Sequence, residues 1–234
     1  MKPVAIFRHH RKEGPGYFAT YLDAQSLPWT VIKIDAGDAP PADAEAYSGF
    51  ALMGGPMRVN DDLPWIPGVL GLIRAAVAQG VPVIGHCLGA QLMSKALGGA
   101  VTLNACKEIG WGRVDVADHD LARDWFGATR SFLSFHWHGE TYSLPEGATC
   151  IASSPYCANQ AFVLGPHLGM QCHVEMTPEI IRSWSVSGRK EIERSASPAV
   201  QSAGEMQAEL EPRVAALHGV ADRLYARWVK NLKR

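Results

Sequence analysis

The sequence predicts an α/β protein built on an open, mostly parallel central sheet with helices on both faces. Two observations indicate this class. Short apolar runs rich in β-branched residues alternate with helical stretches, and a glycine-flanked turn joins one of these runs directly to a helix. The 234 residues, 47% of them hydrophobic, can bury one large core, so we expect a single domain over residues 1–234.

The apolar runs and the periodic stretches give the expected elements in order. We expect strands at residues 4–7, 29–34, 49–53 and 81–84. Residues 64–79 carry apolar side chains near helical spacing and are followed by Gly80, which favours a helix packed on one face of the sheet. A second helix is expected at residues 90–97, ending at Gly98-Gly99.

The second half of the chain has a different pattern. From Gly98 to about residue 173 it indicates shorter strands and turns, so we expect mixed β-structure there. Residues 185–204 are polar and form the only plausible linker, which we interpret as a connection within the domain. Residues 205–234 have apolar side chains at helical intervals, and this predicts one long C-terminal helix packed on the domain.

Composition excludes several classes of protein. The net charge of −1 and the absence of a long Lys/Arg block argue against a nucleic-acid binder or a binder of anionic membranes. The five cysteines show no paired metal-ligand spacing, which fits reduced thiols in a cytoplasmic protein. No apolar run approaches the roughly 20 residues that span a bilayer, and the N-terminal run is too short for a signal peptide.

The segment 81–91 carries the strongest chemical signal, because a buried-strand pattern passes into a helix through Gly85-His86-Cys87-Leu88-Gly89. Glycines on both sides allow a sharp strand-turn-helix elbow that presents Cys87 at the carboxyl edge of the sheet. A helix N-terminus there stabilises a thiolate. A cysteine in a plain apolar strand is usually inert core, and Cys106, Cys150 and Cys157 lack any other setting. We therefore predict Cys87 as the nucleophile.

An oxyanion next to this cysteine needs two backbone donors. In such elbows one donor is the N–H of the residue after the nucleophile, here Leu88. The second must come from another loop at the same edge, and Gly54-Gly55-Pro56, directly after the strand at 49–53, is suitably placed.

A thiol nucleophile also needs a base and a group that orients the base. In Gln171-Cys172-His173-Val174-Glu175, residues two apart point the same way in an extended chain, so Glu175 can lie beside His173. A lone histidine would more often be a hydrogen-bonded core group, and the carboxylate at i+2 favours the catalytic interpretation. His136 and His138 could instead form a zinc set with His173 or Cys172, but no richer ligand cluster supports this, so we expect no metal and no cofactor.

Together, the elbow at 85–91, the loop at 54–56 and the His-x-Glu pair resemble the triad class of glutamine amidotransferases. Within this class the chain looks most similar to stand-alone GMP synthase-like amidotransferases. The likeness spans roughly residues 50–180, and it is supported by three further stretches: Met53-Gly54-Gly55-Pro56-Met57-Arg58-Val59-Asn60-Asp61-Asp62, Lys107-Glu108-Ile109-Gly110-Trp111-Gly112 and His136-Trp137-His138-Gly139-Glu140.

The resemblance implies a flavodoxin-like, class I glutamine amidotransferase-like sheet, and it implies roles for individual residues. Gly55 and Leu88 would supply the oxyanion N–H groups, while Gln91 and the backbone around His138, Gly139 and Glu140 would hold glutamine. The sequence departs from the commoner pattern at Glu140, where Asp is usual, and at Val174, where Pro often separates the histidine and the glutamate.

The expected reaction is attack of Cys87 on the side-chain amide of glutamine, followed by hydrolysis of a γ-glutamyl thioester. The sequence has no P-loop and no second domain for activating an acceptor, so a separate synthetase subunit would use the ammonia. One alternative is a γ-glutamyl hydrolase that cleaves a substituted amide or peptide, and another is a non-catalytic binding or regulatory module. The apolar positions of the C-terminal helix could also serve as a homodimer contact.

Overall fold

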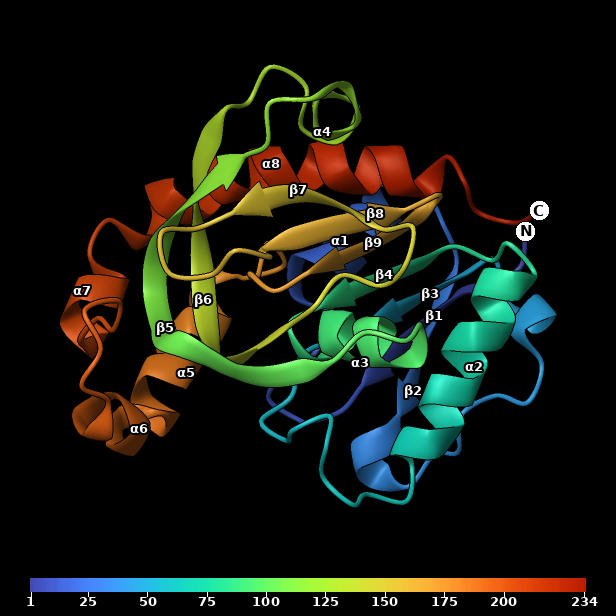
Figure 1. Ribbon diagram of the computed structural model, residues 1–234, viewed down its shortest axis with the longest axis horizontal. Helices are drawn as coiled ribbons and strands as arrows, with labels where there is room; N and C mark the ends of the chain where they lie inside the picture. The colour runs from blue at the N-terminus through green and yellow to red at the C-terminus, as the bar shows by residue number, and fades with distance from the viewer.

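A nine-stranded sheet with the strand order β2-β1-β3-β4-β9-β8-β7-β5-β6 forms the centre of the molecule, and the computed structural model describes all 234 residues (Figure 1). The strands are β1 Val4–Arg8, β2 Trp29–Lys33, β3 Gly49–Leu52, β4 Val83–His86, β5 Val101–Val116, β6 Ser131–Tyr142, β7 Thr149–Ser153, β8 Ala161–Leu164 and β9 His167–Met170. The helices are α1 Gly16–Ala24, α2 Ile66–Ala78, α3 Leu88–Ala96, α4 Asp120–Phe126, α5 Pro178–Ser187, α6 Arg189–Arg194, α7 Ala203–Gln207 and α8 Leu210–Val229, with short 3₁₀ turns η1 Ile34–Ala36 and η2 Ala44–Ala46.

The sheet has a parallel half and an antiparallel half. Strands β2, β1, β3, β4 and β9 pair in parallel. From β9 onward every pairing is antiparallel. The predicted α/β class is confirmed, and one continuous sheet runs through both halves.

Helices cover both faces of the parallel half because alternate residues of each strand point to opposite sides. Val4 and Ile6 of β1 face a core built with α1, α4, α5 and α8. Ala5 and Phe7 face a second core built with α2 and α3. The predicted helices at 64–79 and 90–97 therefore correspond to α2 and α3, both on the same face of the sheet.

The antiparallel half differs from the expectation of short strands. Strands β5 and β6 have 16 and 12 residues and form one long hairpin. Their pairing shifts register between Leu103 and Glu108, and Gly110 has φ +105°. These irregularities interrupt the alternation of apolar and polar residues along β5, so its sequence does not look like one strand.

One expectation for the C-terminal third was wrong, and a second was incomplete. Residues 205–234 do not form one helix: α7 starts with a capping box between Ser202 and Glu205, and Glu209 at φ +50° separates it from α8. The expected linker at 185–204 contains α6, and Val200 forms a parallel bridge with Ile109 of β5. The linker is therefore part of the folded domain.

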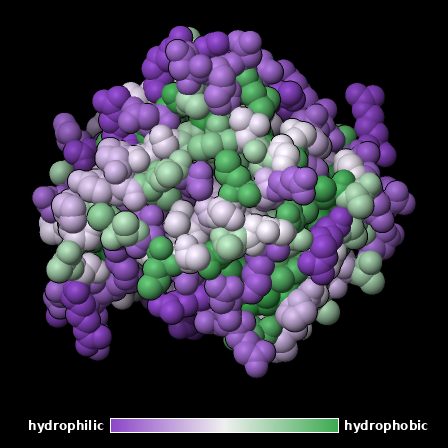
Figure 2. All heavy atoms as spheres, in the orientation of Figure 1, coloured by the Kyte–Doolittle hydropathy of each residue, from purple (hydrophilic) through white to green (hydrophobic).

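The face drawn in Figure 2 has no large hydrophobic patch, because hydrophilic residues separate smaller hydrophobic areas. None of the helices combines the length and the hydropathy that crossing a bilayer requires.

Candidate active site

Four segments meet at one edge of the sheet because each follows the carboxyl end of a parallel strand. Residues 9–13 follow β1, Gly54-Gly55 follows β3, Cys87 follows β4 and residues 171–175 follow β9. Ligand sites of open α/β sheets lie at this edge. A pocket of about 650 Å³ opens here, and residues from all four segments line it.

Cys87 occupies a tight elbow between β4 and α3. Its backbone has φ +50° and ψ −107°, a conformation that costs a non-glycine residue about 1–3 kcal/mol. A Cβ on Gly85 would lie 2.6 Å from the nitrogen of Ala90, and a Cβ on Gly89 would overlap the carbonyl oxygen of Leu52. Both glycines are thus required by close approach, as predicted. The side chain of Cys87 reaches the pocket although the residue is only 7% exposed.

His173 and Glu175 form a buried pair beside this cysteine. Nδ1 of His173 donates a hydrogen bond of 2.6 Å to Oε1 of Glu175, while its Nε2 has no hydrogen-bond partner. Cε1 of His173 and Cβ of Cys87 lie 3.2 Å and 3.8 Å from the point that a Cβ on Gly54 would occupy. The structure therefore brings the imidazole and the thiol together across Gly54, as the sequence predicts.

The electrostatics of the pair reinforce one another. Burial acts to lower the pKa of His173, but the charges of Glu175 and Cys87 outweigh it and raise the pKa well above its ordinary value. Burial acts to raise the pKa of Glu175, but His173 and His86 outweigh it, and the pKa falls to about 2. This arrangement favours an imidazolium at His173 beside the carboxylate of Glu175.

Two residues that sequence reasoning missed lie behind Glu175. Nε2 of His86 is 3.9 Å from Oε2 of Glu175 and shares a hydrogen bond of 3.1 Å with the hydroxyl of Tyr225 on α8. Burial lowers the pKa of His86. His86 sits inside the elbow and could have been suspected from its position, whereas nothing local marks Tyr225.

The predicted oxyanion donors are neighbours. A Cβ on Gly55 would lie 2.8 Å from Cδ2 of Leu88, so the two segments touch. Leu88 is the first residue of α3, and its N–H therefore has no partner inside the helix.

The four predicted substrate contacts, Gln91, His138, Gly139 and Glu140, all line the pocket. Nε2 of Gln91 donates to Oε1 of Gln171 at 3.1 Å and to the carbonyl of Glu140 at 3.5 Å. Nε2 of Gln171 in turn donates to Sγ of Cys87 at 3.4 Å. A chain of amides therefore links the predicted substrate segment of β6 to the thiol.

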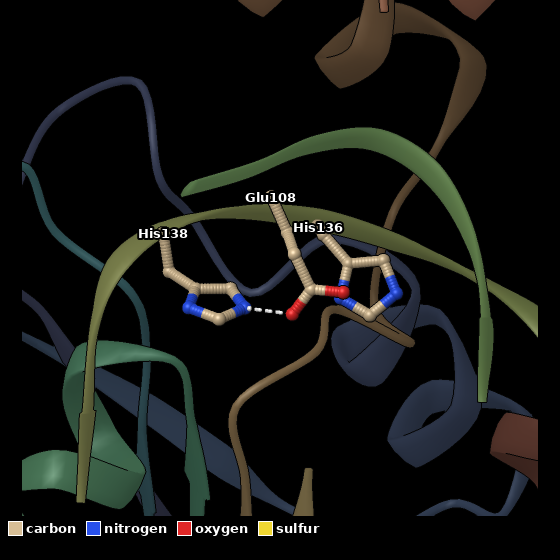
Figure 3. A group of neighbouring side chains, drawn as sticks. All are labelled: Glu108, His136 and His138. Carbon is tan, nitrogen blue, oxygen red and sulfur yellow. Dashed lines mark ion pairs between the residues drawn. The ribbon is translucent and has the colours of Figure 1, made fainter. Parts of the chain in front are cut away.

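His138 of that segment forms a second histidine–carboxylate pair with Glu108 of β5 (Figure 3). Nε2 of His138 faces Oε2 of Glu108 at 3.0 Å, and its Nδ1 donates to the carbonyl of Glu140 at 3.0 Å. Glu108 also accepts hydrogen bonds from Ser154 and Gln160. Burial acts to raise the pKa of Glu108, but contacts with His138 and the nearby His136 outweigh it and lower the pKa.

His136 completes a group of metal-ligand type with Glu108 and His138. One ligand atom from each of the three lies within 4.8 Å of the others (Figure 3). The zinc alternative weighed from the sequence joined His136 and His138 to His173 or Cys172, and the structure brings Glu108 to them instead. Because both oxygens of Glu108 already accept hydrogen bonds, we interpret the group as a polar network and propose no metal there.

Several further residues of the pocket were missed. His10, Lys12 and Glu13 come from the segment after β1, and Trp184, Ser187, Gly188 and Glu191 come from α5, α6 and their junction. The ring of Trp184 stands edge-on to His173, with centroids 5.1 Å apart. Glu13 could have been predicted, because it follows the carboxyl end of β1 as Gly54 follows β3 and Cys87 follows β4. Ser187, Gly188 and Glu191 lay in the segment whose sequence suggested a linker, and Trp184 lies directly before it.

Comparison with known proteins agrees with this geometry. Residues 18–183 match the family described as "Glutamine amidotransferase class-I". The structure of a glutamine amidotransferase from Methylobacillus flagellatus is 46% identical, with a TM-score of 0.98 over 100% of this chain and 96% of that one. Gamma-glutamyl peptidase 3 of Arabidopsis thaliana is 28% identical over 73% of both chains. A glutamine-hydrolysing GMP synthase of Pseudomonas syringae is 36% identical over 56% of this chain and 26% of that protein.

Proposed function

The chain belongs to the class-I glutamine amidotransferase family, and from that premise we propose that it hydrolyses the side-chain amide of glutamine and releases ammonia. The observation that carries the proposal is the 2.6 Å bond between His173 and Glu175 next to the strained elbow at Cys87. A thiol, an imidazole and a carboxylate in this order form the nucleophile, base and orienting group of covalent amide hydrolysis.

In the proposed reaction the thiolate of Cys87 attacks the amide carbon, and His173 protonates the departing ammonia. Water activated by His173 then cleaves the γ-glutamyl thioester and releases glutamate. Glu175 keeps Nδ1 of His173 protonated, so that Nε2 is the atom that donates a proton to the departing ammonia and accepts one from water. The N–H groups of Gly55 and Leu88 bind the oxyanion, and losing one such donor lowers kcat by about 10² to 10³.

We assign the glutamate half of the substrate to the side of the pocket formed by Gln91, His138, Gly139 and Glu140. Support comes from the hydrogen bonds that tie Gln91 to Glu140 and, through Gln171, to the thiol. These contacts preorganise the wall that the amino-acid head group would touch.

The ammonia needs an acceptor, and we propose a separate synthetase subunit that meets the chain in the cytoplasm. The GMP synthase relative, of which the match covers only 26%, supports a partner role for this type of domain. The five free cysteines fit a reducing compartment.

A γ-glutamyl hydrolase is the second candidate. The pocket of about 650 Å³ belongs to a size class that holds ligands larger than free glutamine. The 28% identity to a gamma-glutamyl peptidase favours the same alternative. Glutamine and γ-glutamyl amides compared side by side as substrates distinguish the two.

The test is ammonia and glutamate release from glutamine, together with mass spectrometry after exposure to a glutamine-like electrophile. We expect one adduct on Cys87, no adduct in Cys87→Ala, and unchanged labelling in the control Cys106→Ala. A wild-type chain that releases no glutamate from any amide and gains no adduct would be a binding module, and the proposal would be wrong.

A further inference from the structure

One carboxylate in the pocket has no role in the reaction proposed above. Glu13 ends a turn after β1, in which its own N–H donates to the carbonyl of His10 at 2.9 Å. The carbonyl of the preceding Lys12 accepts a hydrogen bond of 3.1 Å from Nε1 of Trp184 on α5. The turn is therefore anchored to the helix that also contacts His173.

Glu13 lies beside the side chains of His173 and Cys87. The point that a Cβ on Gly54 would occupy lies 2.6 Å from Oε2 of Glu13, 3.2 Å from Cε1 of His173 and 3.8 Å from Cβ of Cys87. The carboxylate, the imidazole and the thiol thus surround one point next to Gly54. Only a glycine leaves room for all three.

No lysine or arginine pairs with this carboxylate. The only basic nitrogen within 4.0 Å is Nδ1 of His10, at 4.0 Å, although the side chain of Glu13 is just 15% exposed. The other charged groups nearby are His173 and Glu175 of the proposed triad, and burial raises the pKa of Glu13 to about 7. A positively charged group on a ligand would stabilise the carboxylate form of this partly desolvated side chain.

The proposed reaction indicates which part of a substrate would meet Glu13. The departing nitrogen must lie next to His173, which protonates it, while the glutamate half faces Gln91 and Glu140. Glu13 lies beside His173, together with His10, Lys12 and Trp184. It therefore borders the space of the leaving group.

We propose that Glu13 binds a positively charged group on the departing amine, so that among substituted γ-glutamyl amides those of diamines are cleaved most efficiently. The inference rests on the hydrolase chemistry proposed above. The sulfur of Cys87 bonds to the carbonyl carbon of the γ-amide, the C–N bond breaks, and the proton of His173 passes to the amine. Water then cleaves the thioester to glutamate and the thiol.

The experiment compares three substrates by glutamate release: glutamine, γ-glutamyl-(4-aminobutyl)amide and the neutral isostere γ-glutamyl-pentylamide. In the wild type we expect kcat/KM for the aminobutyl amide to exceed that for the pentyl amide at least about tenfold, because a hydrogen bond to a charged group is worth that much. The ratio should fall toward one in Glu13→Gln and persist in Glu146→Gln, an exposed control that removes the same charge outside the pocket.

Each outcome decides the matter. A wild-type ratio near one, or a ratio that survives Glu13→Gln, overturns the role of Glu13 while glutamine hydrolysis and labelling of Cys87 leave the hydrolase proposal standing. If neither hydrolysis nor labelling occurs, both proposals fail. The wild-type ratio tests the inference even if Glu13→Gln folds poorly, and circular dichroism of both variants shows whether they fold.

Discussion

Two buried histidine–carboxylate pairs lie within the same domain and do different things. His173 and Glu175 are two residues apart after β9 and join at 2.6 Å. His138 and Glu108 come from β6 and β5 and face each other at 3.0 Å. Distance and burial are similar in the two pairs, so neither explains the difference in role that we propose.

The difference is what stands beside the imidazole nitrogen that makes no hydrogen bond, which is Nε2 in both pairs. Nε2 of His173 stands near Cys87. Nε2 of His138 faces only the carboxylate of Glu108, which Ser154 and Gln160 share, and its Nδ1 is bonded to the carbonyl of Glu140. A histidine–carboxylate pair is thus poised for catalysis when its open nitrogen stands beside a nucleophile, and it is structural when both nitrogens face groups of the fold.

Replacing each histidine by glutamine should give the largest difference in activity between the two pairs. His173→Gln removes the base and should lower kcat by on the order of 10⁴ or more, as for other triads. His138→Gln should mainly raise KM, because it releases the carbonyl of Glu140 in the substrate wall. Steady-state kinetics of ammonia release measure both, and equal losses of kcat would remove the distinction.

Neutralising the carboxylates gives the next contrast. Glu175→Gln should lower kcat by about 10³ to 10⁴, because the amide no longer favours the imidazolium or the required tautomer. Glu108→Gln should instead lower the free energy of unfolding by about 1–3 kcal/mol, because it disturbs a buried polar network. Urea unfolding beside kcat checks this. A stable Glu108→Gln with a large loss of kcat would contradict the structural role.

Acid should act on the two regions in different windows. The pKa of His136 is lowered to about 4 by burial, so the unfolded chain binds a proton that the native chain lacks between about pH 6.5 and 4, and stability falls as the pH drops through that window. The pKa of Glu175 is lowered to about 2, so its contribution is present above about pH 4.5 and is lost as the pH falls toward 2.

The variant His136→Gln tests the contribution of this histidine to the first window. We expect the free energy of unfolding to depend less on pH between 6.5 and 4 in this variant than in the wild type. Denaturant titrations at fixed ionic strength measure the slope. An unchanged slope would mean that His136 does not titrate as its burial indicates.

A smaller effect is expected from Tyr225→Phe, which removes the hydroxyl that bonds His86 behind Glu175. Loss of one hydrogen bond should lower the free energy of unfolding by about 0.5–1.5 kcal/mol. The matched control is Tyr142→Phe, because the hydroxyl of Tyr142 is buried without a partner. If the control loses as much stability as Tyr225→Phe, the bond to His86 has no special value.

No effect is expected from a chelator if the group of Glu108, His136 and His138 is a polar network. Ammonia release and thermal unfolding should be the same before and after dialysis against a chelator. Loss of either, restored by one divalent metal, would overturn our assignment of no metal to this group.

The sequence predicts the parts of the site whose causes are local. The elbow at Cys87 depends on close approaches of Gly85 and Gly89 within a few residues, and these can be inferred from glycine spacing alone. Likewise, an i and i+2 spacing is enough to join His173 and Glu175. The α/β class and the two helices α2 and α3 follow from periodicity in the same way.

The parts that escaped prediction depend on contacts between distant segments. Glu108 meets His138 only because β5 and β6 pair across a register shift. The polar segment before α7 folds because Thr177 and Pro178 start α5 and Val200 joins β5. The break at Glu209 requires a left-handed backbone at a residue that rarely adopts it, which no helical periodicity shows.

The contact between Tyr225 and His86 makes α8 more than a cover for the sheet. Removal of the C-terminal residues from Tyr225 onward, or a partner that tilts α8, would disturb His86, which stands next to Glu175 at the end of β4, together with the contacts that Trp228 and Leu232 make at Gly49 of β3. Activity should therefore depend on how α8 packs against the sheet, so that changes at the C-terminal end of the chain would act at a distance on the carboxylate of the proposed triad.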